Sequence, residues 1–214
     1  MVDGPVREGH ETVGVVVATY GDEDEWTPLA KRAVESAMDN TIEPNFTIHV
    51  HRMNLAGARN YGLLKMLNMD WVIFLDADDE LDPHYIEHML AAQGDIRQPS
   101  TLGVHPDGHE DDYPVLIPPH PGGYMVGNHL IIGCMVRRDL ALAVGGFRDL
   151  PSLEDWDFWI RCQLEGARVG AAPEAIYRVH VRPQSRNKDE RLHGRVYADI
   201  QQRYQFDWQL KGLR

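Results

Sequence analysis

The sequence predicts an α/β fold in which a mainly parallel sheet is flanked by helices. Three runs, 13–18, 71–75 and 130–136, are almost continuously apolar, which is typical of strands buried on both faces of a parallel sheet. Segments with helical spacing separate such runs, and this alternation favours an α/β layer architecture. The length of 214 residues indicates one domain with room for an appended lobe.

The first part of the chain alternates regularly. We expect a strand at 13–18, a helix at 27–40, a strand at 46–50, a helix at 56–67, a strand at 71–75 and a helix at 82–94. Thr27 is the expected N-cap of the first helix, with Pro28 at the first helical position. Asp82 is the expected cap of the third helix, before Pro83.

The second part is less regular. Between residues 95 and 128 the pattern gives way to Pro, Gly, His and Asp, which predicts a long irregular excursion with one short strand at most; long loops of this kind are often functional. Beyond it we expect a strand at 130–136, a helix at 152–165, a short strand at 175–179 and an exposed helix at 189–204.

Composition excludes several classes of protein. A formal charge of −12 disfavours non-specific binding to nucleic acid. No apolar run approaches the roughly 20 residues that span a bilayer, and the first residues lack an apolar signal core, so we expect a cytoplasmic protein. Cys134 and Cys162 lie in apolar segments and are expected as buried hydrophobes that form neither a disulfide nor a zinc site.

An acidic turn, Asp76-Ala77-Asp78-Asp79-Glu80, directly follows the strand at 71–75. Carboxylates this close repel one another unless a cation compensates, and hard oxygen ligands suit magnesium, manganese or calcium. In a parallel sheet, ligands bind beyond the carboxyl ends of the strands. We therefore expect the turns at 19–22 and 76–79 to face one pocket.

Four interpretations of this turn compete. It is a solvated acidic turn, an EF-hand loop, the Asp-x-Asp motif of a haloacid-dehalogenase-like phosphatase, or a metal clamp for a nucleotide diphosphate. The EF-hand is rejected because Leu81 occupies the position that requires glycine. The phosphatase, with Asp76 as nucleophile, remains the weaker alternative because its motif normally lies on the first strand. The clamp fits an acidic protein that must bind an acidic donor.

A second acidic cluster surrounds Trp156. Ser152 and Asp155 have the spacing of a capping box, which is the structural alternative to a functional role. Trp156 and Trp159 beside acids favour an amphipathic rim that stacks on sugars or bases. An aspartate at a helix N-terminus stays ionised near neutral pH, as a general base for a hydroxyl group must.

Together these motifs resemble the inverting family-2 glycosyltransferases of the GT-A fold, the compact non-processive kind. The resemblance covers about residues 12–187 and follows the family's order. The matching stretches are Val15–Tyr20, Gly57–Gly62, Phe74–Asp79, Gly145–Arg148 and Glu154–Arg161.

The resemblance implies a role for each matching residue. Thr19 and Tyr20 would line the nucleotide pocket, with Arg59 near the nucleotide. Asp76 would contact the ribose or a metal-bound water, and Asp78 would bind the manganese or magnesium ion of the DXD motif. Asp155, paired with Glu154, would be the catalytic base. His180 is then a candidate third metal ligand and Arg186 a phosphate contact; in the acceptor site, the candidates are Tyr124, His129, Trp156 and Trp159.

The chain departs from the family at the base-reading turn after the second strand. His49–Asn54 stands where the family usually has an Asp-Asp-Gly-Ser-like turn, so the nucleotide base is unassigned and Asp22 is the available substitute. The processive Gln-x-x-Arg-Trp motif is absent as well: Gln201-Gln202-Arg203-Tyr204 has the wrong spacing. We expect transfer of single sugars.

The resemblance implies one GT-A-like catalytic domain at 1–188, with a nucleotide-binding part at about 12–94, an acceptor-side part at about 95–188 and a helical tail at 189–214. The expected activity is metal-dependent, inverting transfer of one sugar from a nucleotide-sugar donor to an acceptor hydroxyl. The acceptor class stays open among glycans, lipid-linked intermediates, proteins and modified nucleic acid, as does the oligomeric state. A catalytically inactive sugar-binding or nucleotide-binding protein of the same fold is the third alternative.

Overall fold

The structure is a computed structural model that describes residues 11–117, 127–182 and 190–210. Its centre is a seven-stranded sheet in the order β2-β1-β3-β6-β5-β7-β4. The strands are β1 (Val13–Tyr20), β2 (Phe46–Arg52), β3 (Trp71–Asp76), β4 (Glu80–Leu81), β5 (Ile96–Val104), β6 (Met135–Arg137) and β7 (Val169–His180). The helices are α1 (Glu23–Met38), α2 (Leu55–Lys65), α3 (Tyr85–Ala91), α4 (Arg138–Ala143), α5 (Glu154–Leu164) and α6 (Glu190–Leu210).

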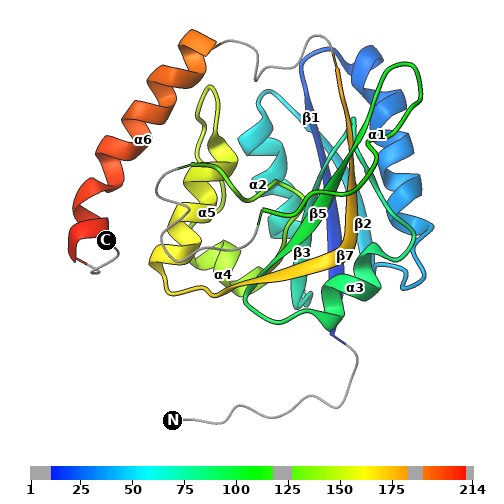
Figure 1. The fold of residues 1–214 in the computed structure, drawn as a ribbon, viewed down its shortest axis with the longest axis horizontal. Coiled ribbons are helices and arrows are strands. Elements are labelled where there is room, and N and C mark those ends of the chain that lie inside the picture. Colours follow the sequence, from blue (N-terminus) through cyan, green and yellow to red (C-terminus); the bar gives the residue numbers. More distant parts are fainter. Residues whose placement is uncertain (1–10, 118–126, 183–189, 211–214) are drawn as a thin grey trace.

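The α/β fold predicted from the sequence is confirmed: the sheet is mixed, and its longest strand pairings are parallel. Strands β1–β2, β1–β3 and β5–β7 pair in parallel, whereas β3–β6, β5–β6 and β4–β7 pair antiparallel. Helices α1 and α3 lie on one side of the sheet, and α2, α4 and α5 on the other (Figure 1). Helix α6 packs outside α5 (Figure 1).

The first and third strands, β1 and β3, are buried as expected. Nearly every side chain of β1 and β3 is inaccessible to solvent, because helices cover both faces of the sheet there. Glycines allow this packing to be close. A Cβ atom at Gly62 of α2 would stand 2.3 Å from a methyl carbon of Val16, so the helix sits directly on β1.

The irregular segment that the sequence predicts from residue 95 is wrong over its first part, which forms a regular strand. Strand β5 runs for nine residues from its start and pairs in parallel with β7, itself twelve residues long. The polar side chains of β5 do not have the apolar pattern that predicts a buried strand. Three of them are hydrogen-bonded inside the fold. The Arg97 guanidinium donates to the carbonyl of Met89, the Gln98 amide to that of His129, and the Ser100 hydroxyl to that of Pro173.

Other boundaries also shift. Helix α1 begins at Glu23, not at Thr27, because the Asp22 carboxylate accepts the N–H of Asp24 and three acidic residues occupy the first turn. Pro28 therefore lies inside the helix. The expected strand at 130–136 is reduced to β6, and α4 follows it directly. The C-terminal helix lies where it was expected, but one of its faces is buried.

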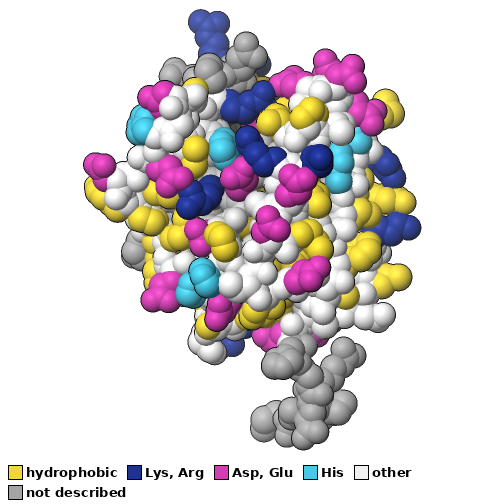
Figure 2. Space-filling model, turned by 90° about the vertical axis from the view of Figure 1, so that its right-hand side faces the viewer, with side chains coloured by type: hydrophobic (Ala, Val, Ile, Leu, Met, Phe, Trp, Pro, Cys, Tyr) yellow, Lys and Arg dark blue, Asp and Glu magenta, His cyan; other side chains and the backbone are white. Residues whose placement is uncertain are grey.

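The surface carries charges of both signs. Acidic and basic side chains are interspersed over the face that includes α1 (Figure 2). Cys134 and Cys162 are buried free thiols, as predicted. Within the described residues, no helix has the length and apolar character needed to cross a membrane.

Candidate active site

The carboxyl ends of β1 and β3 lie at one edge of the sheet, as the sequence predicted. Ala18 pairs with Asp76 in the parallel register, so Thr19 and the acidic turn follow neighbouring strands. The Thr19 side chain is buried, and its hydroxyl group contacts His49 Nε2 at 2.8 Å and His51 Nδ1 at 3.1 Å. Tyr20 is half-buried beside them. Asp22 is occupied as the cap of α1.

Arg59 joins the acidic turn to the second acidic cluster. Its guanidinium, almost fully buried, donates through Nη2 to Asp76 Oδ1 at 2.7 Å and through Nη1 to Glu154 Oε1 at 2.9 Å. Burial alone would lower the pKa of Arg59, but the facing carboxylates of Asp76 and Glu154 raise it overall. The ring of Phe147 lies 5.1 Å from the guanidinium carbon. Glu154 is thus held by an arginine and is buried away from solvent.

The capping box does not form. Helix α5 begins after Leu153, whose backbone is left-handed at φ 57° and whose side chain makes no cap hydrogen bond. The Ser152 hydroxyl lies 3.4 Å from His193 Nδ1 instead. The helix therefore begins at a left-handed residue without a capping side chain.

Asp155 faces a cavity. Its Oδ2 accepts from the Asn128 amide at 2.8 Å, and its Oδ1 accepts from the backbone N–H of Trp156 at 2.8 Å. Burial, together with the neighbouring charge of Glu154, raises the pKa of Asp155 to about 6. Desolvation thus outweighs the hydrogen bonds that favour the ionised form. The carboxylate is still mainly ionised at pH 7.

The cavity brings both acidic clusters together in one place. Its volume is about 460 Å³. It is lined by residues from the end of β3, the start of α5, the 128–132 segment, α2 and α6: Arg59, Asp76, Asn128, Ile132, Ser152, Leu153, Glu154, Asp155, His193 and Tyr197. A volume of this size accommodates a sugar ring.

Asp78 lies in a separate ion-pair group. Arg182 Nη1 approaches Asp78 Oδ2 at 3.5 Å, while its Nη2 contacts Glu25 Oε1 at 2.6 Å. The guanidinium also lies over the ring of Trp26. Burial and the charge of Asp76 raise the pKa of Asp78. A positive partner at this position is therefore electrostatically favoured.

His180 is not brought together with these acids as a ready ligand. Its backbone N–H donates to Asp79 Oδ1 at 2.9 Å, and its Nε2 lies 3.5 Å from Glu80 Oε2. Within the described part of the chain, no three His, Cys, Asp or Glu side chains are positioned to hold a metal ion. Asp76 and Asp78 keep partly accessible carboxylates, with side chains 35% and 25% exposed. Two carboxylates of this kind would fit a hard divalent cation such as magnesium or manganese.

The acceptor candidates among the described residues do not line the cavity. Trp156 and Trp159 are buried in the core and do not form an exposed rim. Trp156 reaches the cavity wall only through Tyr197, whose ring stacks on it at 4.8 Å. His129 is not among the residues that line the cavity. Its backbone carbonyl accepts a hydrogen bond from the Gln98 amide. Tyr124 and Arg186 lie outside the described residues.

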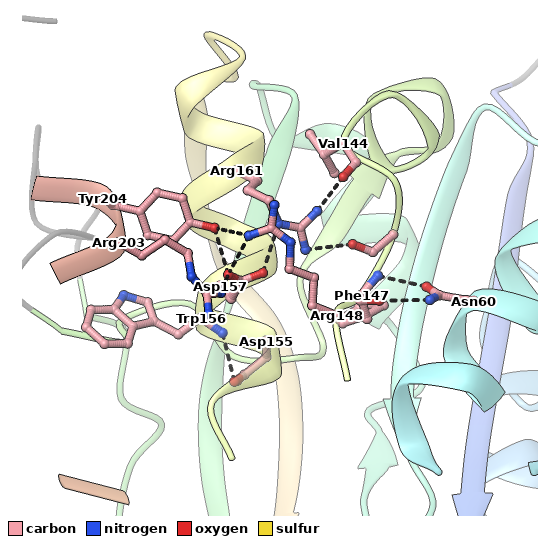
Figure 3. A network of polar contacts seen from close by, with 11 residues as sticks. Asn60, Val144, Phe147, Arg148, Asp155, Trp156, Asp157, Arg161, Arg203 and Tyr204 are labelled. Carbon is pink, nitrogen blue, oxygen red and sulfur yellow. Dashed lines mark hydrogen bonds and ion pairs between the residues drawn. The ribbon is translucent and has the colours of Figure 1, made fainter. Parts of the chain in front are cut away.

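Asp157 lies on the side of α5 that faces α6, and the sequence motifs assign it no role. Its buried carboxylate accepts from Arg161 Nε at 2.8 Å and from the Tyr204 hydroxyl at 2.7 Å (Figure 3). Arg148 and Arg203 contact Oδ1, the oxygen that also accepts from Tyr204, at 3.2 and 3.1 Å. The hub thus links α5 to α6. The i, i+4 spacing of Val196, Ile200 and Tyr204, all buried against α5, was the signal available in the sequence for this contact.

The histidines of the excursion form a hairpin. The imidazole rings of His105 and His109 stack at 4.1 Å, and each contacts an aspartate, Asp111 and Asp107 respectively. A polar loop is thereby held closed by local contacts. Asp112 is exposed on it, and His120 lies outside the described residues.

The comparisons with known proteins agree with this fold. Residues 15–114 match the family described as "Glycosyl transferase family 2". No curated protein sequence matches the chain. Among solved structures, S. aureus TarS 1-349 in complex with UDP-GlcNAc has 16% identity and a TM-score of 0.61, over 88% of this chain and 66% of that one. S. aureus TarS has 17% identity and a TM-score of 0.57, over 81% and 37% of the two chains.

These findings agree with the resemblance found in the sequence: residues 15–114 match the family 2 glycosyltransferase model, and the fold is similar to that of TarS. The chain spans less than two thirds of the length of the TarS chain in the 1-349 structure and in the complex of 1-349 with UDP, 60% and 61% respectively. At 16% identity the likeness to TarS concerns the fold.

Proposed function

We propose that this protein is a metal-dependent, inverting glycosyltransferase that moves one sugar from a nucleotide-sugar to an acceptor hydroxyl, with Asp155 as general base. The observation that carries the proposal is the single cavity that holds Asp155 and Asp76 together, joined by the buried Arg59. A donor diphosphate at the end of β3 and an acceptor beside α5 would meet in this cavity.

The proton chemistry follows from the environment of Asp155. Its carboxylate, with a pKa of about 6, is mainly ionised at pH 7 and still basic enough to take the proton of an acceptor hydroxyl group. The acceptor oxygen then forms a bond to the anomeric carbon while the bond from that carbon to the diphosphate oxygen breaks. Attack from the face opposite the leaving group inverts the configuration.

Arg59 and the acidic turn position the donor. Arg59 binds Asp76 through one nitrogen and Glu154 through the other. The acidic turn after β3, which would hold the donor, and the start of α5, which carries Asp155, therefore keep their relative position. Glu154 is a positioning residue in this proposal. A divalent cation held by Asp78 and Asp76 would neutralise charge on the departing diphosphate. The cluster of like charges at Asp76 and Asp78 favours such a cation.

The experiment is a panel of nucleotide-sugars with manganese, scored for slow hydrolysis of the donor to free sugar and nucleoside diphosphate. UDP-GlcNAc comes first because TarS was crystallised with it. We expect one donor to turn over, and EDTA to abolish the turnover. Asp155→Asn should lose at least about a thousandfold in transfer, a loss within the range for a general base and its electrostatic role.

Asp139→Asn is the matched control, since the Asp139 side chain is 95% exposed. It should behave like the wild type. Hydrolysis of a generic phosphomonoester that is lost on Asp76→Asn would favour the phosphatase instead. Binding of nucleotide with manganese but without turnover would favour an inactive binding protein. Equal activity of Asp155→Asn and the wild type would refute the assignment of the base.

A further inference from the structure

Helix α6 forms a wall of the cavity that holds the proposed base. His193 and Tyr197 are one helical turn apart, so their side chains project from the same face of the helix. Both are half-buried and both line the cavity beside Asp155. His193 is also in contact with the Ser152 hydroxyl, at the turn that leads into α5. The wall therefore touches the element that carries the base.

This wall is held in place by packing and by ionic contacts. Val196, Ile200 and Tyr204 bury their side chains against Trp156 and Ile160 of α5. One turn further along, Tyr204 and Arg203 bind the buried Asp157 carboxylate (Figure 3). Because contacts of both kinds fix α6 to α5, the two cavity-facing side chains keep a defined position relative to Asp155.

The charges of the cavity select the kind of acceptor. Three carboxylates, Asp76, Glu154 and Asp155, line it against one guanidinium, that of Arg59. Two of those carboxylates already occupy this guanidinium. An anionic acceptor group beside Asp155 would be repelled by the remaining negative charge. A neutral acceptor would not be.

The other groups in the cavity suit a hydroxyl-rich ring. Ser152, Asn128 and His193 offer polar side chains that donate or accept hydrogen bonds. Tyr197 adds a flat aromatic surface, which the stacked indole of Trp156 supports from behind, with the two ring planes 22° apart. Aromatic faces combined with a few polar groups are the usual means of binding a sugar ring.

We propose that α6 builds the acceptor subsite: Tyr197 stacks on the ring and His193 binds a hydroxyl of a neutral glycoside acceptor. This assignment rests on the glycosyltransferase function proposed above and adds to it the acceptor class and two residues that select it. Phosphorylated acceptors would be poor substrates. Tyr197 takes the place that the sequence had suggested for Trp156.

The test uses the full chain and the donor that the wild type hydrolyses. Acceptors are p-nitrophenyl glycosides of neutral sugars, with glucose 6-phosphate as the anionic probe. The variants are Tyr197→Leu, which keeps apolar volume against Trp156 but lacks the flat ring, Tyr197→Phe, and His193→Ala. Gln202→Ala, on the exposed face of α6, is the matched control. The readouts are the acceptor KM, the ratio of transfer to donor hydrolysis, and glycoside binding by saturation-transfer NMR.

We expect the wild type to use a neutral glycoside at least about tenfold better than the sugar phosphate. Tyr197→Leu should raise the KM for this glycoside about tenfold and lower the transfer-to-hydrolysis ratio, whereas Tyr197→Phe should stay within about threefold. His193→Ala should raise the KM about fivefold, the loss of one hydrogen bond. Gln202→Ala should match the wild type.

Two results overturn the acceptor subsite while leaving the proposed function intact. One is donor hydrolysis with no transfer to any neutral glycoside, or with better transfer to the sugar phosphate. The other is a Tyr197→Leu variant with the acceptor KM and NMR signal of Gln202→Ala. If the wild type hydrolyses no nucleotide-sugar at all, the proposed function fails, and the acceptor subsite fails with it.

Discussion

Arg59 and Glu154 form a buried ion pair, 2.9 Å between Nη1 and Oε1, although 95 residues separate them in the chain. The pair connects α2 with the first turn of α5 in the wall of the cavity. The other terminal nitrogen of Arg59, Nη2, donates to Asp76 at the end of β3. One side chain thus ties together the three elements from which the proposed site is built.

Replacement of Arg59 by Met should therefore destabilise the protein strongly. It leaves two carboxylates without their counter-ion, one of them buried, and breaking such a pair costs about 3 to 5 kcal/mol. Chemical denaturation monitored by tryptophan fluorescence would measure the loss. The double variant Arg59→Met with Glu154→Gln removes a stranded charge and should recover part of it. A double variant less stable than the single one would contradict this account.

The pH dependence of transfer should report on Asp155. Since the base must be ionised, kcat/KM should rise with pH, with an apparent pKa near 6, and level off above it. Asn128→Ala removes a hydrogen bond that stabilises the ionised form, so the limb should move about one unit to higher pH. A pH–rate series on both proteins tests this. A shift to lower pH would show that Asn128 does not act on the carboxylate.

Asp157 should matter for stability and for the seating of α6. Asp157→Ala leaves the buried Arg161 without its partner and frees Tyr204 and Arg203, at a cost of about 3 to 5 kcal/mol. Arg203→Ala is the control; because the Arg203 side chain is 40% exposed, its removal should cost less than about 1 kcal/mol. Thermal unfolding of the two variants provides the comparison. If Asp157→Ala and Arg203→Ala lost the same stability, Asp157 would not be the residue that holds α6 against α5.

Arg182 should compete with a cation for Asp78. The guanidinium and a bound manganese ion would both neutralise the same carboxylate, so Arg182→Gln should tighten manganese binding several-fold, as titration calorimetry can measure. Lys31→Gln, on the exposed face of α1, is a control that should leave the affinity unchanged. Weaker binding in Arg182→Gln would indicate that Arg182 supports the cation site.

The sequence predicted the parts of this fold whose side chains are uniformly apolar. Strands β1 and β3 and the acidic turn were recovered because a strand buried on both faces leaves a distinct pattern. Strand β5 was not, since Arg97, Gln98 and Ser100 are polar residues buried with partners that are remote in the chain. No local pattern indicates those partners.

The same limit applies to the candidate site. Asp76, Asp78 and Asp155 were singled out from motifs, and the shared sheet edge of the turns at 19–22 and 76–79 followed from the strand order. The roles of Arg59 as a joint and of α6 as a cavity wall depend on contacts over 95 and about 40 residues. The raised pKa of Asp155 was missed for a related reason: desolvation depends on the whole cavity, whereas the helix end is visible locally.

Leu153 combines two structural demands that favour different amino acids. Its left-handed backbone, at φ 57°, would suit glycine, yet its side chain fills the contact between α5 and α6 and is only 8% exposed. Glycine would relieve the backbone at the expense of an internal void, and any β-branched residue would worsen the conformation. An engineer who seeks a more heat-resistant protein would therefore gain from neither glycine nor a β-branched residue at the turn that leads into the acid pair.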